Sequence, residues 1–445
     1  MSTDAEVVVV GAGAAGMTAA LRAARGGRVI VFEKSTRHGC NTQYSSGSLA
    51  AGGTRLQAEA GIEDSPERHA RDILAASGDP GAAALVRAVC AAAPRYVDWL
   101  VDELDHPLEL GIDMPRAGQS VPRLHTDPGR GGGKVLVQTL RRAMSAVADI
   151  TFVDETPVIG LRYDGARVTG VRVREHTGEQ EVTADEVVLA CDGYGNNPDL
   201  LRRFTPDAAT AFHGGVSTSR GDAVIWGERI GAGLRNMGAY LGHGQVVAGH
   251  GTRLNPNLPF LGALMVDGAG RRFCDEKAQG YSRLGGLIRR LPGERAVMIW
   301  DEPAHEVARH SELMRESIAA GAFRRYADLS SLAGGLGLPE DTLGRTLDGF
   351  VAASDLVKRP VERLRPPWYA AWITHGILTT QGGLLIDAEG HVLRPDGTPI
   401  PGLSAAGGAA TGISGPSPDG YSSGNGLLAA MGMGWIVGNR LGSAD

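Results

Sequence analysis

The chain has 445 residues, a formal net charge of -6 at pH 7 and 65 glycines. Its length predicts two domains, or one large domain with an insertion. No basic stripe points to nucleic acid or to an anionic membrane surface as a partner. Neither a signal peptide nor a run of about 18 apolar residues is present, so we expect a cytoplasmic protein without membrane association.

Glycine is about twice as frequent as in an ordinary protein, which favours close backbone approaches around a large ligand. A glycine- and alanine-rich genome is the alternative. The cysteines are scattered, at Cys40, Cys90, Cys191 and Cys274. They form no CxxC, CxxCH or CxxxxC pattern, so structural zinc, bound haem and dithiol chemistry have no basis in the sequence, and we expect no metal site. We expect four buried thiols instead.

The first predicted element is a βαβ unit over residues 5–33. A run of β-branched residues breaks at three glycines and continues into an alanine-rich helix and a second strand. Gly11 permits the turn, Gly13 lets the backbone approach a pyrophosphate, and Gly16 lets helix and strand pack closely. Glu33 ends the second strand, where it can accept hydrogen bonds from a ribose and disfavours a 2′-phosphate. FAD or NAD therefore fits better than NADP.

A polar, glycine-punctuated loop follows at 34–53, and a loop of that length after a nucleotide-binding strand usually holds a ligand. Residues 65–103 have helical spacing, and a further amphipathic helix begins at Lys134. Alternating residues from 150 to 191 predict a small antiparallel meander that returns to a buried strand. That strand ends in a second glycine turn at 190–195.

The composition becomes mixed from 238 to 374, with two short predicted helices within 329–350, and we interpret this stretch as an inserted cap domain. Strand, turn and helix then resume, with a third glycine-rich turn ending at Gly408. We therefore predict a discontinuous nucleotide-binding domain over 1–238, with its small β-meander at about 150–190, and 375–445. The cap domain then covers 239–374.

With these motifs in order, the chain resembles the flavoprotein family that contains fumarate reductases, succinate dehydrogenase flavoprotein subunits, 3-ketosteroid dehydrogenases, urocanate reductase and tricarballylate dehydrogenase. The resemblance covers nearly the whole chain. It is carried by the GAGAAG unit with Glu33 and by GCNTQYSSGSLAAGG, VVLACDGYGNNPDLLRRF, SRGDAVIWGERIGAGLRNM, GRRFCDE, TQGGLLID, IPGLSAAGGAATG and GYSSGNGLLAA. It implies an α/β fold: a discontinuous Rossmann-like FAD-binding domain with an inserted, mobile α+β cap domain, and substrate between the two against the flavin ring.

The resemblance also implies how FAD is held. Asn41 and Thr42 stand where covalent flavoproteins carry a His-Thr pair, and His38 comes too early, so we expect non-covalent FAD. Gly408 stands where the family commonly has a Glu or Asp that holds the ribitol, so that contact is lost or supplied by water. The implied cofactor-binding residues are Gly11, Gly13, Ala14, Ala15, Gly16, Glu33, Lys34, Asn41, Thr42, Ser46, Gly47, Ala190, Gly193, Gly407, Gly408, Asn425, Gly426 and Leu427.

Family chemistry moves a hydride between a substrate carbon and flavin N5, and a proton at the adjacent carbon. The protein supplies the proton acceptor or donor. In fumarate reductases an arginine proton shuttle stands four residues after the Glu of the RFxNE motif; here that position is Gly280. Tyr281 follows it, about where 3-ketosteroid dehydrogenases have a tyrosine base, so Tyr281 is the candidate base or acid. Arg283 is its competitor, and packing within the cap is the alternative role of Tyr281.

Tyr421 stands four residues before Asn425, where fumarate reductases present a carboxylate-clamping arginine. A tyrosine there resembles the ketosteroid and tricarballylate enzymes and would donate to a substrate oxygen, with backbone N–H groups at Gly424 and Gly426 completing an oxyanion site. A structural tyrosine is the alternative. His243 matches a substrate-binding histidine of the family but lacks the proline that usually follows, so a core or hinge role is equally open.

Two further departures concern the substrate. The second substrate histidine of the family is missing, because Leu378 stands before TTQGG and His375 lies upstream. Together with the two lost arginines, this favours a ketone or another weakly anionic substrate over a small dicarboxylate. The polar loop residues Arg116, Arg123 and His125 are expected to be solvated.

We therefore expect an FAD-dependent oxidoreductase that acts on the α,β carbon–carbon bond of a carbonyl-activated small molecule. Without a haem motif or a second dinucleotide fingerprint, electrons pass through a separate donor or acceptor. Two alternatives stay open: an FAD oxidase of C–N or C–O bonds, and a flavin-binding interaction protein whose eroded site has lost catalysis.

Overall fold

Two units make up the chain. The computed structural model describes residues 3–112, 118–129, 131–277, 280–350, 352–354 and 359–443, and for 280–281, 352–354 and 359–362 the backbone alone. Unit 1 comprises Met1–Ala209, Gly215–Tyr240 and Thr379–Asp445, and unit 2 comprises Thr210–Gly214 and Leu241–Leu378. The chain therefore enters and leaves unit 2 twice.

Within its described residues, unit 1 contains an eight-stranded sheet in which β20-β21-β9-β1-β2-β6 are neighbours in that order. In addition, β8 pairs with β9, and β7 pairs with β8. Its strands are β1 (Ala5–Val10), β2 (Val29–Phe32), β6 (Ile150–Val153), β7 (Val158–Tyr163), β8 (Val168–Glu175), β9 (Gly178–Leu189), β20 (His391–Leu393) and β21 (Pro399–Ala405). β1 pairs in parallel with both β2 and β9. Its valines are buried on both faces, as a central parallel strand requires.

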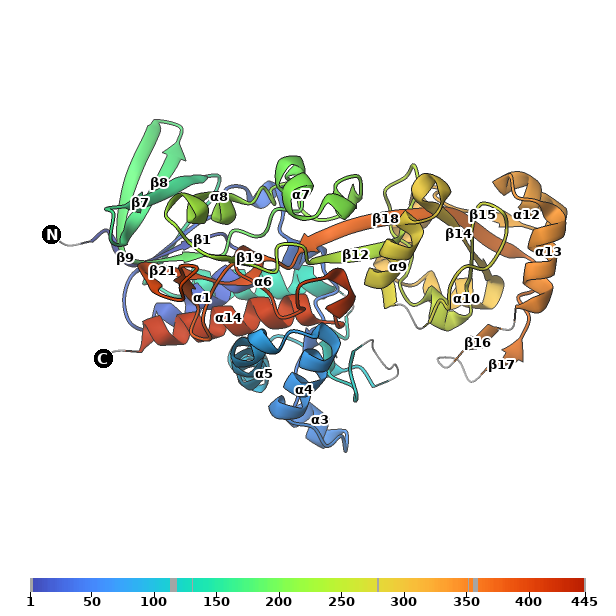
Figure 1. Ribbon diagram of the computed structural model, residues 1–445. Coiled ribbons are helices and arrows are strands. Elements are labelled where there is room, and N and C mark those ends of the chain that lie inside the picture. The colour runs from blue at the N-terminus through green and yellow to red at the C-terminus, as the bar shows by residue number, and fades with distance from the viewer. Residues whose placement is uncertain are drawn as a thin grey trace. The chain divides into compact units, whose positions relative to one another are not determined.

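The predicted meander is confirmed for β7, β8 and β9, which pair antiparallel and form the hairpins at upper left in Figure 1. It is wrong for Ile150–Val153, because β6 joins the main sheet parallel to β2. The physical reason is that β6 follows a helix, and a strand that returns after a crossover helix lies parallel to its neighbour.

Helices α1 (Ala14–Ala23) and α14 (Asn425–Gly442) pack side by side (Figure 1). Gly434 and Gly438 of α14 face the backbone of α1: an added Cβ would lie 2.4 Å from the Ala15 oxygen and 2.6 Å from the Ala19 oxygen. Residues four apart share one helix face. Part of the glycine excess therefore serves helix packing, in addition to any ligand.

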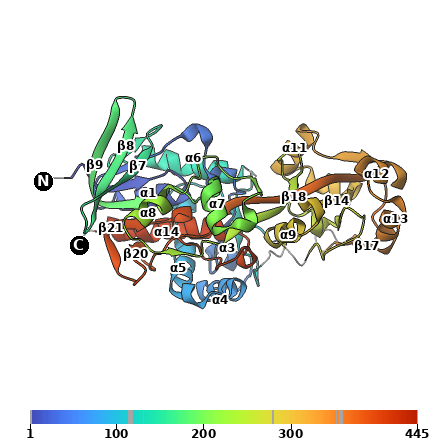
Figure 2. The same cartoon turned by 45° about the horizontal axis from the view of Figure 1, so that its top comes forward.

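The other helices of unit 1 are α2 (Asn41–Tyr44), α3 (Arg55–Glu59), α4 (Pro66–Ser77), α5 (Ala83–Asp102), α6 (Gly132–Ser145), α7 (Pro198–Phe204) and α8 (Asp222–Arg229). The helical prediction for 65–103 is confirmed in type, but Gly78 at φ 60° ends α4 with a left-handed C-cap, so two helices form. Figure 2 shows α4 and α5 next to each other. Short strands complete the unit: β3 (Leu49–Ala50), β4 (Glu109–Leu110), β5 (Leu124–Thr126), β11 (Leu234–Arg235) and β19 (Gly383–Leu384).

Unit 2 is built on the long strand β18. In the described residues its sheet has the order β10-β18-β14-β13, and β12 and β15 also pair with β18. These strands are β10 (Phe212–His213), β12 (Tyr240–Val247), β13 (Leu264–Val266), β14 (Arg295–Asp301), β15 (Arg324–Tyr326) and β18 (Trp368–Thr380). Alternate residues of β14 enter two separate apolar clusters, Met298 and Trp300 in one and Val297 and Ile299 in the other. Both faces of the sheet are therefore covered.

The helices of unit 2 are α9 (Gly280–Arg289), α10 (Glu302–Ala308), α11 (Glu312–Ala319), α12 (Leu329–Leu336) and α13 (Glu340–Gly349), and β16 (Ala352–Ser354) pairs with β17 (Arg359–Glu362). The two short helices predicted within 329–350 are confirmed as α12 and α13. Among all described residues, no helix combines the length and the apolar character that a membrane crossing requires.

Candidate cofactor and active site

The turn between β1 and α1 has the backbone geometry of a dinucleotide-binding loop. Gly11 has φ 103°, and an added Cβ would lie 2.5 Å from the Ala190 oxygen. A Cβ on Gly16 would lie 1.9 Å from the Gly11 oxygen, so only glycine permits this packing. Around Gly13 the nearest atom to an added Cβ is Thr42 Oγ1 at 3.7 Å, which leaves this part of the backbone open to a phosphate.

Glu33 is held against this turn. Its Oε2 accepts a hydrogen bond from Ala12 N at 2.8 Å, and its Oε1 accepts one from Ser35 N at 3.0 Å. The half-buried carboxylate thus lies at the carboxyl ends of β1 and β2, where a ribose hydroxyl can donate to it and a 2′-phosphate is repelled. Lys34 is engaged elsewhere, because its Nζ donates to Asp222 at 2.8 Å and to the Thr218 oxygen at 2.6 Å.

The loop after β2 folds back onto the same turn. Thr42 Oγ1 accepts from Ala14 N at 3.0 Å, which satisfies one free N–H at the start of α1. Asn41 accepts from Val216 N at 2.9 Å and donates to Asp192 Oδ2 at 2.5 Å. Because Val216 fixes the amide's orientation, Asp192 must be an acceptor, and Ser219 donates to the same oxygen. Asp192 itself has a left-handed φ of 72°.

Gly47 and Ser46 lie farther along this loop. Gly47 has φ 69°, and an added Cβ would lie 2.4 Å from the carbonyl carbon of Gly132 at the start of α6. Ser46 is exposed and donates to Ser48 Oγ at 2.9 Å. The loop is therefore packed on α6 through glycine and leaves a serine hydroxyl at the surface of unit 1.

Two further glycine turns, far apart in sequence, meet the first turn of α1. A Cβ added to Gly407 would lie 2.9 Å from Ala15 Cβ, and one added to Gly408 would lie 2.8 Å from Gly193 N. Ala190 N donates to the Val10 oxygen at 2.9 Å, which places the end of β9 beside the end of β1. Segments near residues 11, 193 and 407 are therefore in contact with one another, as a single long ligand would require.

FAD fits this arrangement. Thr411 Oγ1, Ser422 Oγ and Asn425 Oδ1 are buried and have no hydrogen-bond partner among the described residues. Buried polar atoms in native proteins are nearly always bonded, so these three fit the polar edges of a ligand. Asn425, Gly426 and Leu427 form the first turn of α14. A helix N-terminus favours negative charge nearby.

Tyr421 lies at the positive end of α14. Gly424 has a left-handed φ of 89° and begins the 18-residue helix, and the hydroxyl of half-buried Tyr421 accepts from Gly426 N at 3.3 Å. Accepting an N–H at a helix N-terminus withdraws electron density from the phenol oxygen, so its own O–H becomes a stronger hydrogen-bond donor. The arrangement can polarise a carbonyl without using a charged side chain.

The candidates of unit 2 lie on two neighbouring elements. His243 is buried in β12, and its Nδ1 accepts from Gln245 N at 3.1 Å. Burial, assisted by the charge of Arg253, lowers the pKa of His243 to about 3, so the imidazole is neutral at pH 7. Ser282 Oγ accepts from Gly242 N at 3.1 Å and thereby joins the start of α9 to this strand.

Tyr281 and Arg283 are on α9, close to that junction. Arg283 is exposed. Tyr281 is the second residue of the helix, and its side chain lies outside the described residues. The structure therefore brings the segments of His243, Tyr281 and Arg283 together within unit 2, and places Tyr421 with the cofactor candidates in unit 1.

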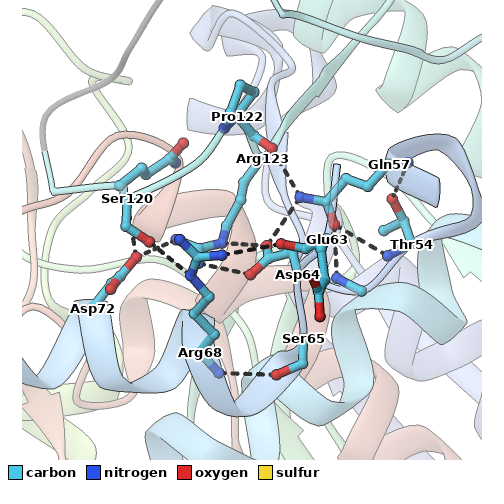
Figure 3. A network of polar contacts seen from close by, with 12 residues as sticks. Thr54, Gln57, Glu63, Asp64, Ser65, Arg68, Asp72, Ser120, Pro122 and Arg123 are labelled. Atoms are coloured by element: carbon cyan, nitrogen blue, oxygen red, sulfur yellow. Dashed lines mark hydrogen bonds and ion pairs between the residues drawn. The ribbon is translucent and has the colours of Figure 1, made fainter. Parts of the chain in front are cut away.

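The expectation that Arg123 and His125 are solvated is wrong, since both are fully buried. Arg123 donates from Nε to Asp64 at 2.6 Å and from Nη1 to Asp72, also at 2.6 Å (Figure 3). His125 contacts Thr54 Oγ1 at 2.9 Å. The acidic partners come from the α4 region, about 50 to 60 residues earlier, and no local pattern predicts this pairing. Arg116 lies outside the described residues.

The expectation of four buried thiols is wrong for three of them. Cys90 is buried, whereas Cys40, Cys191 and Cys274 are half-buried because each lies in or next to a loop or turn. Loss of hydration still raises the pKa of Cys191 and of Cys274 to about 12, so neither is a thiolate at neutral pH. In the described residues, no group of three or more His, Cys, Asp or Glu side chains is arranged to hold a metal ion.

Comparisons with known proteins agree with this geometry. The chain matches the family described as FAD binding domain over residues 6–426. It is 28% identical to the probable fumarate reductase Ifc3 of Shewanella frigidimarina, over 99% of this chain and 75% of that protein. It is 25% identical to the 3-oxosteroid 1-dehydrogenase of Mycobacterium tuberculosis, over 93% of this chain and 95% of that protein.

Among solved structures, the open conformation of a flavocytochrome c3 fumarate reductase superposes with a TM-score of 0.83 at 27% identity, over 98% of this chain and 78% of that chain. A family match across nearly the entire sequence, the same fold and the glycine turns that meet at the end of β1 lead to one assignment. The chain belongs to the FAD-binding domain family of flavoproteins.

Proposed function

We propose a specific reaction for this FAD-dependent oxidoreductase of CH–CH bonds: hydride transfer between flavin N5 and the α,β carbon–carbon bond of a ketone-like substrate. The observation that carries the proposal is the hydroxyl of Tyr421, which accepts the Gly426 N–H at the start of α14. A carbonyl oxygen placed there would receive a polarised O–H donor, and enolate-like charge would be stabilised by a donor that is already oriented.

Unit 1 would hold FAD, which supplies or accepts the hydride when bound. The turn from Gly11 to Gly16 and the start of α1 would hold the pyrophosphate, and Glu33 a ribose. Attachment is non-covalent in this proposal, because Asn41 carries an amide that is already bonded to Asp192 and Val216. Unit 2 would then be the cap that carries the remaining candidates.

The substrate class follows from charge. A small dicarboxylate needs cationic partners when it is removed from water. Tyr421 carries no positive charge, and His243 is neutral because burial lowers its pKa to about 3. Two uncharged groups match a ketone better than fumarate, and we infer that the substrate is an enone or its saturated counterpart.

The proton step falls to α9. In the oxidative direction Tyr281 would take the proton from the carbon next to the carbonyl, while the neighbouring carbon loses its hydride; in the reductive direction both steps reverse. Arg283 competes for this role. Because the sequence has no haem attachment motif and no second dinucleotide fingerprint, we propose that electrons pass to or from a separate carrier.

The test is anaerobic bleaching or reoxidation of the flavin spectrum with a panel of enones, saturated ketones and fumarate. Tyr421→Phe should lower kcat/KM for the best ketone by about 100-fold or more while the FAD content stays at parent level. Tyr281→Phe should lower kcat. Tyr163→Phe serves as the matched control, because it removes a half-buried hydroxyl of β7 that donates to the Gly165 oxygen and accepts from Arg394. Parent rates in both Tyr421→Phe and Tyr281→Phe would refute the assignment.

A further inference from the structure

The segment Gly118–Leu124, which we call the brace, contacts the turn Ser422–Gly424 at three points. A Cβ added to Gly118 would lie 2.7 Å from Ser422 Cβ, so the two backbones are close. Gln119 Nε2 donates to the Ser423 oxygen at 2.8 Å. A Cβ added to Gly424 would lie 2.9 Å from Leu124 Cδ2. Each residue of the turn therefore lies against one residue of the brace.

The brace is itself anchored to α4 by buried charge. Arg123 lies between Asp64 and Asp72, and Asp72 also accepts from the backbone N–H of Ser120 at 2.9 Å (Figure 3). Gln57 donates to the oxygen of Pro122 at 2.8 Å. Arg123 and Asp64 are both shielded from water, and bidentate Arg–carboxylate pairs have a fixed geometry, so the brace is held as a rigid support.

The turn held by the brace determines the geometry at Tyr421. Asn425 N donates to the Ser422 oxygen at 3.1 Å, and Leu428 N donates to the Gly424 oxygen at 3.0 Å. The Ser423 carbonyl between them is bonded by Gln119 instead, which fixes the plane of the peptide leading into Gly424. Rotation of that peptide would change the left-handed φ of Gly424 and move the Tyr421 hydroxyl away from Gly426 N.

We propose that Gln119 is a positioning residue for the reaction: it acts through Ser423 to hold the Tyr421 hydroxyl at the N-terminus of α14. The effect of Gln119 on the reaction rests on the proposed function, whereas its effect on the position of the Tyr421 hydroxyl does not. The proposal connects the Asp64–Arg123–Asp72 ion group to the carbonyl-polarising site.

The first test is hydrogen exchange of the FAD-bound protein. Gln119→Leu removes the donor to Ser423, and exchange of the Asn425, Gly426 and Leu428 amides should become about fivefold faster, as expected for the loss of one ordinary hydrogen bond. Exchange in α1 and α5 should stay at the parent rate. Gln180→Leu is the matched control, because it removes an exposed amide that donates to Glu175. Unchanged exchange at the start of α14 in Gln119→Leu would overturn the proposal.

The second test is a double-mutant cycle on turnover. Gln119→Leu should lower kcat about tenfold with KM little changed, and Gln119→Leu combined with Tyr421→Phe should be no slower than Tyr421→Phe alone, because both changes remove the same interaction. Gln119→His keeps an N–H donor and should recover most of the lost rate. Multiplicative effects would overturn the positioning role. If the parent turned over no ketone, the proposed function would fail, and the exchange result would still decide whether the brace holds the turn.

Discussion

Replacing Arg123 by methionine should destabilise unit 1 strongly. The guanidinium makes two bonds to Asp64, at 2.6 and 2.9 Å, and one to Asp72 at 2.6 Å. The side chains of Arg123 and Asp64 are 0% exposed, so Arg123→Met leaves a carboxylate buried without a counter-charge. Loss of one partner of a buried ion pair costs about 3–5 kcal/mol, a large fraction of the 5–15 kcal/mol by which proteins of this kind are stable.

The assay is urea unfolding at pH 7, followed by far-UV circular dichroism. Arg55→Met is the control, because Arg55 and Asp102 form an ion pair at 2.8 Å in which both side chains are about half exposed, and such pairs contribute about 0–1 kcal/mol. If the free energy of unfolding of Arg123→Met were within about 1 kcal/mol of the parent value, the reasoning would be refuted.

The same interaction predicts a pH dependence. Burial raises the pKa of Asp64, but hydrogen bonds from Arg123 and Gln57 outweigh it and hold the pKa below its usual value of 3.8. A depressed folded pKa contributes stability above the unfolded pKa, and that stability is lost as the pH falls through the folded pKa. The difference in the free energy of unfolding between Arg123→Met and the parent should therefore be largest at pH 7 and should shrink below about pH 4.

Three further outcomes are expected. Gly16→Ala should abolish FAD binding, seen as loss of visible flavin absorbance, because the added Cβ would lie 1.9 Å from a backbone oxygen, whereas Gly334→Ala, with no atom within 4 Å, should bind FAD normally. Burial and the nearby Arg123 charge lower the pKa of His69 from 6.5 to about 3. Its unfolded form binds the extra proton, so the free energy of unfolding should fall by about 1.4 kcal/mol for each unit by which the pH drops between these two values. In His69→Gln this dependence of stability on pH should be weaker by that amount. Burial raises the pKa of Cys90 to about 12, so a thiol reagent at pH 8 should label this cysteine in urea but leave it unlabelled in the native protein.

The sequence by itself determined the features that depend on local periodicity and turn chemistry. A βαβ unit is predicted by the valine run, the glycines at 11, 13 and 16 and the acid at 33. The prediction is possible because a strand, a left-handed turn and close helix packing each restrict which residues can stand within a few positions of one another. The short helices within 329–350 and the hairpins of β7, β8 and β9 are predictable for the same reason. Membership of the FAD-binding family also follows from motifs in order along the chain.

Only the tertiary structure decided which distant residues meet. Arg123 belongs to a polar loop in sequence, and its burial depends on Asp64 and Asp72, which no local pattern connects to it. Likewise Gln119 and Ser423 are 304 residues apart, and their hydrogen bond exists because β3 and β5 form a sheet beneath the start of α14. Interactions between residues close in sequence restrict φ, ψ and the periodicity of apolar residues. Ion pairing, burial and the orientation of Tyr421 instead depend on contacts that form only when the whole chain has packed.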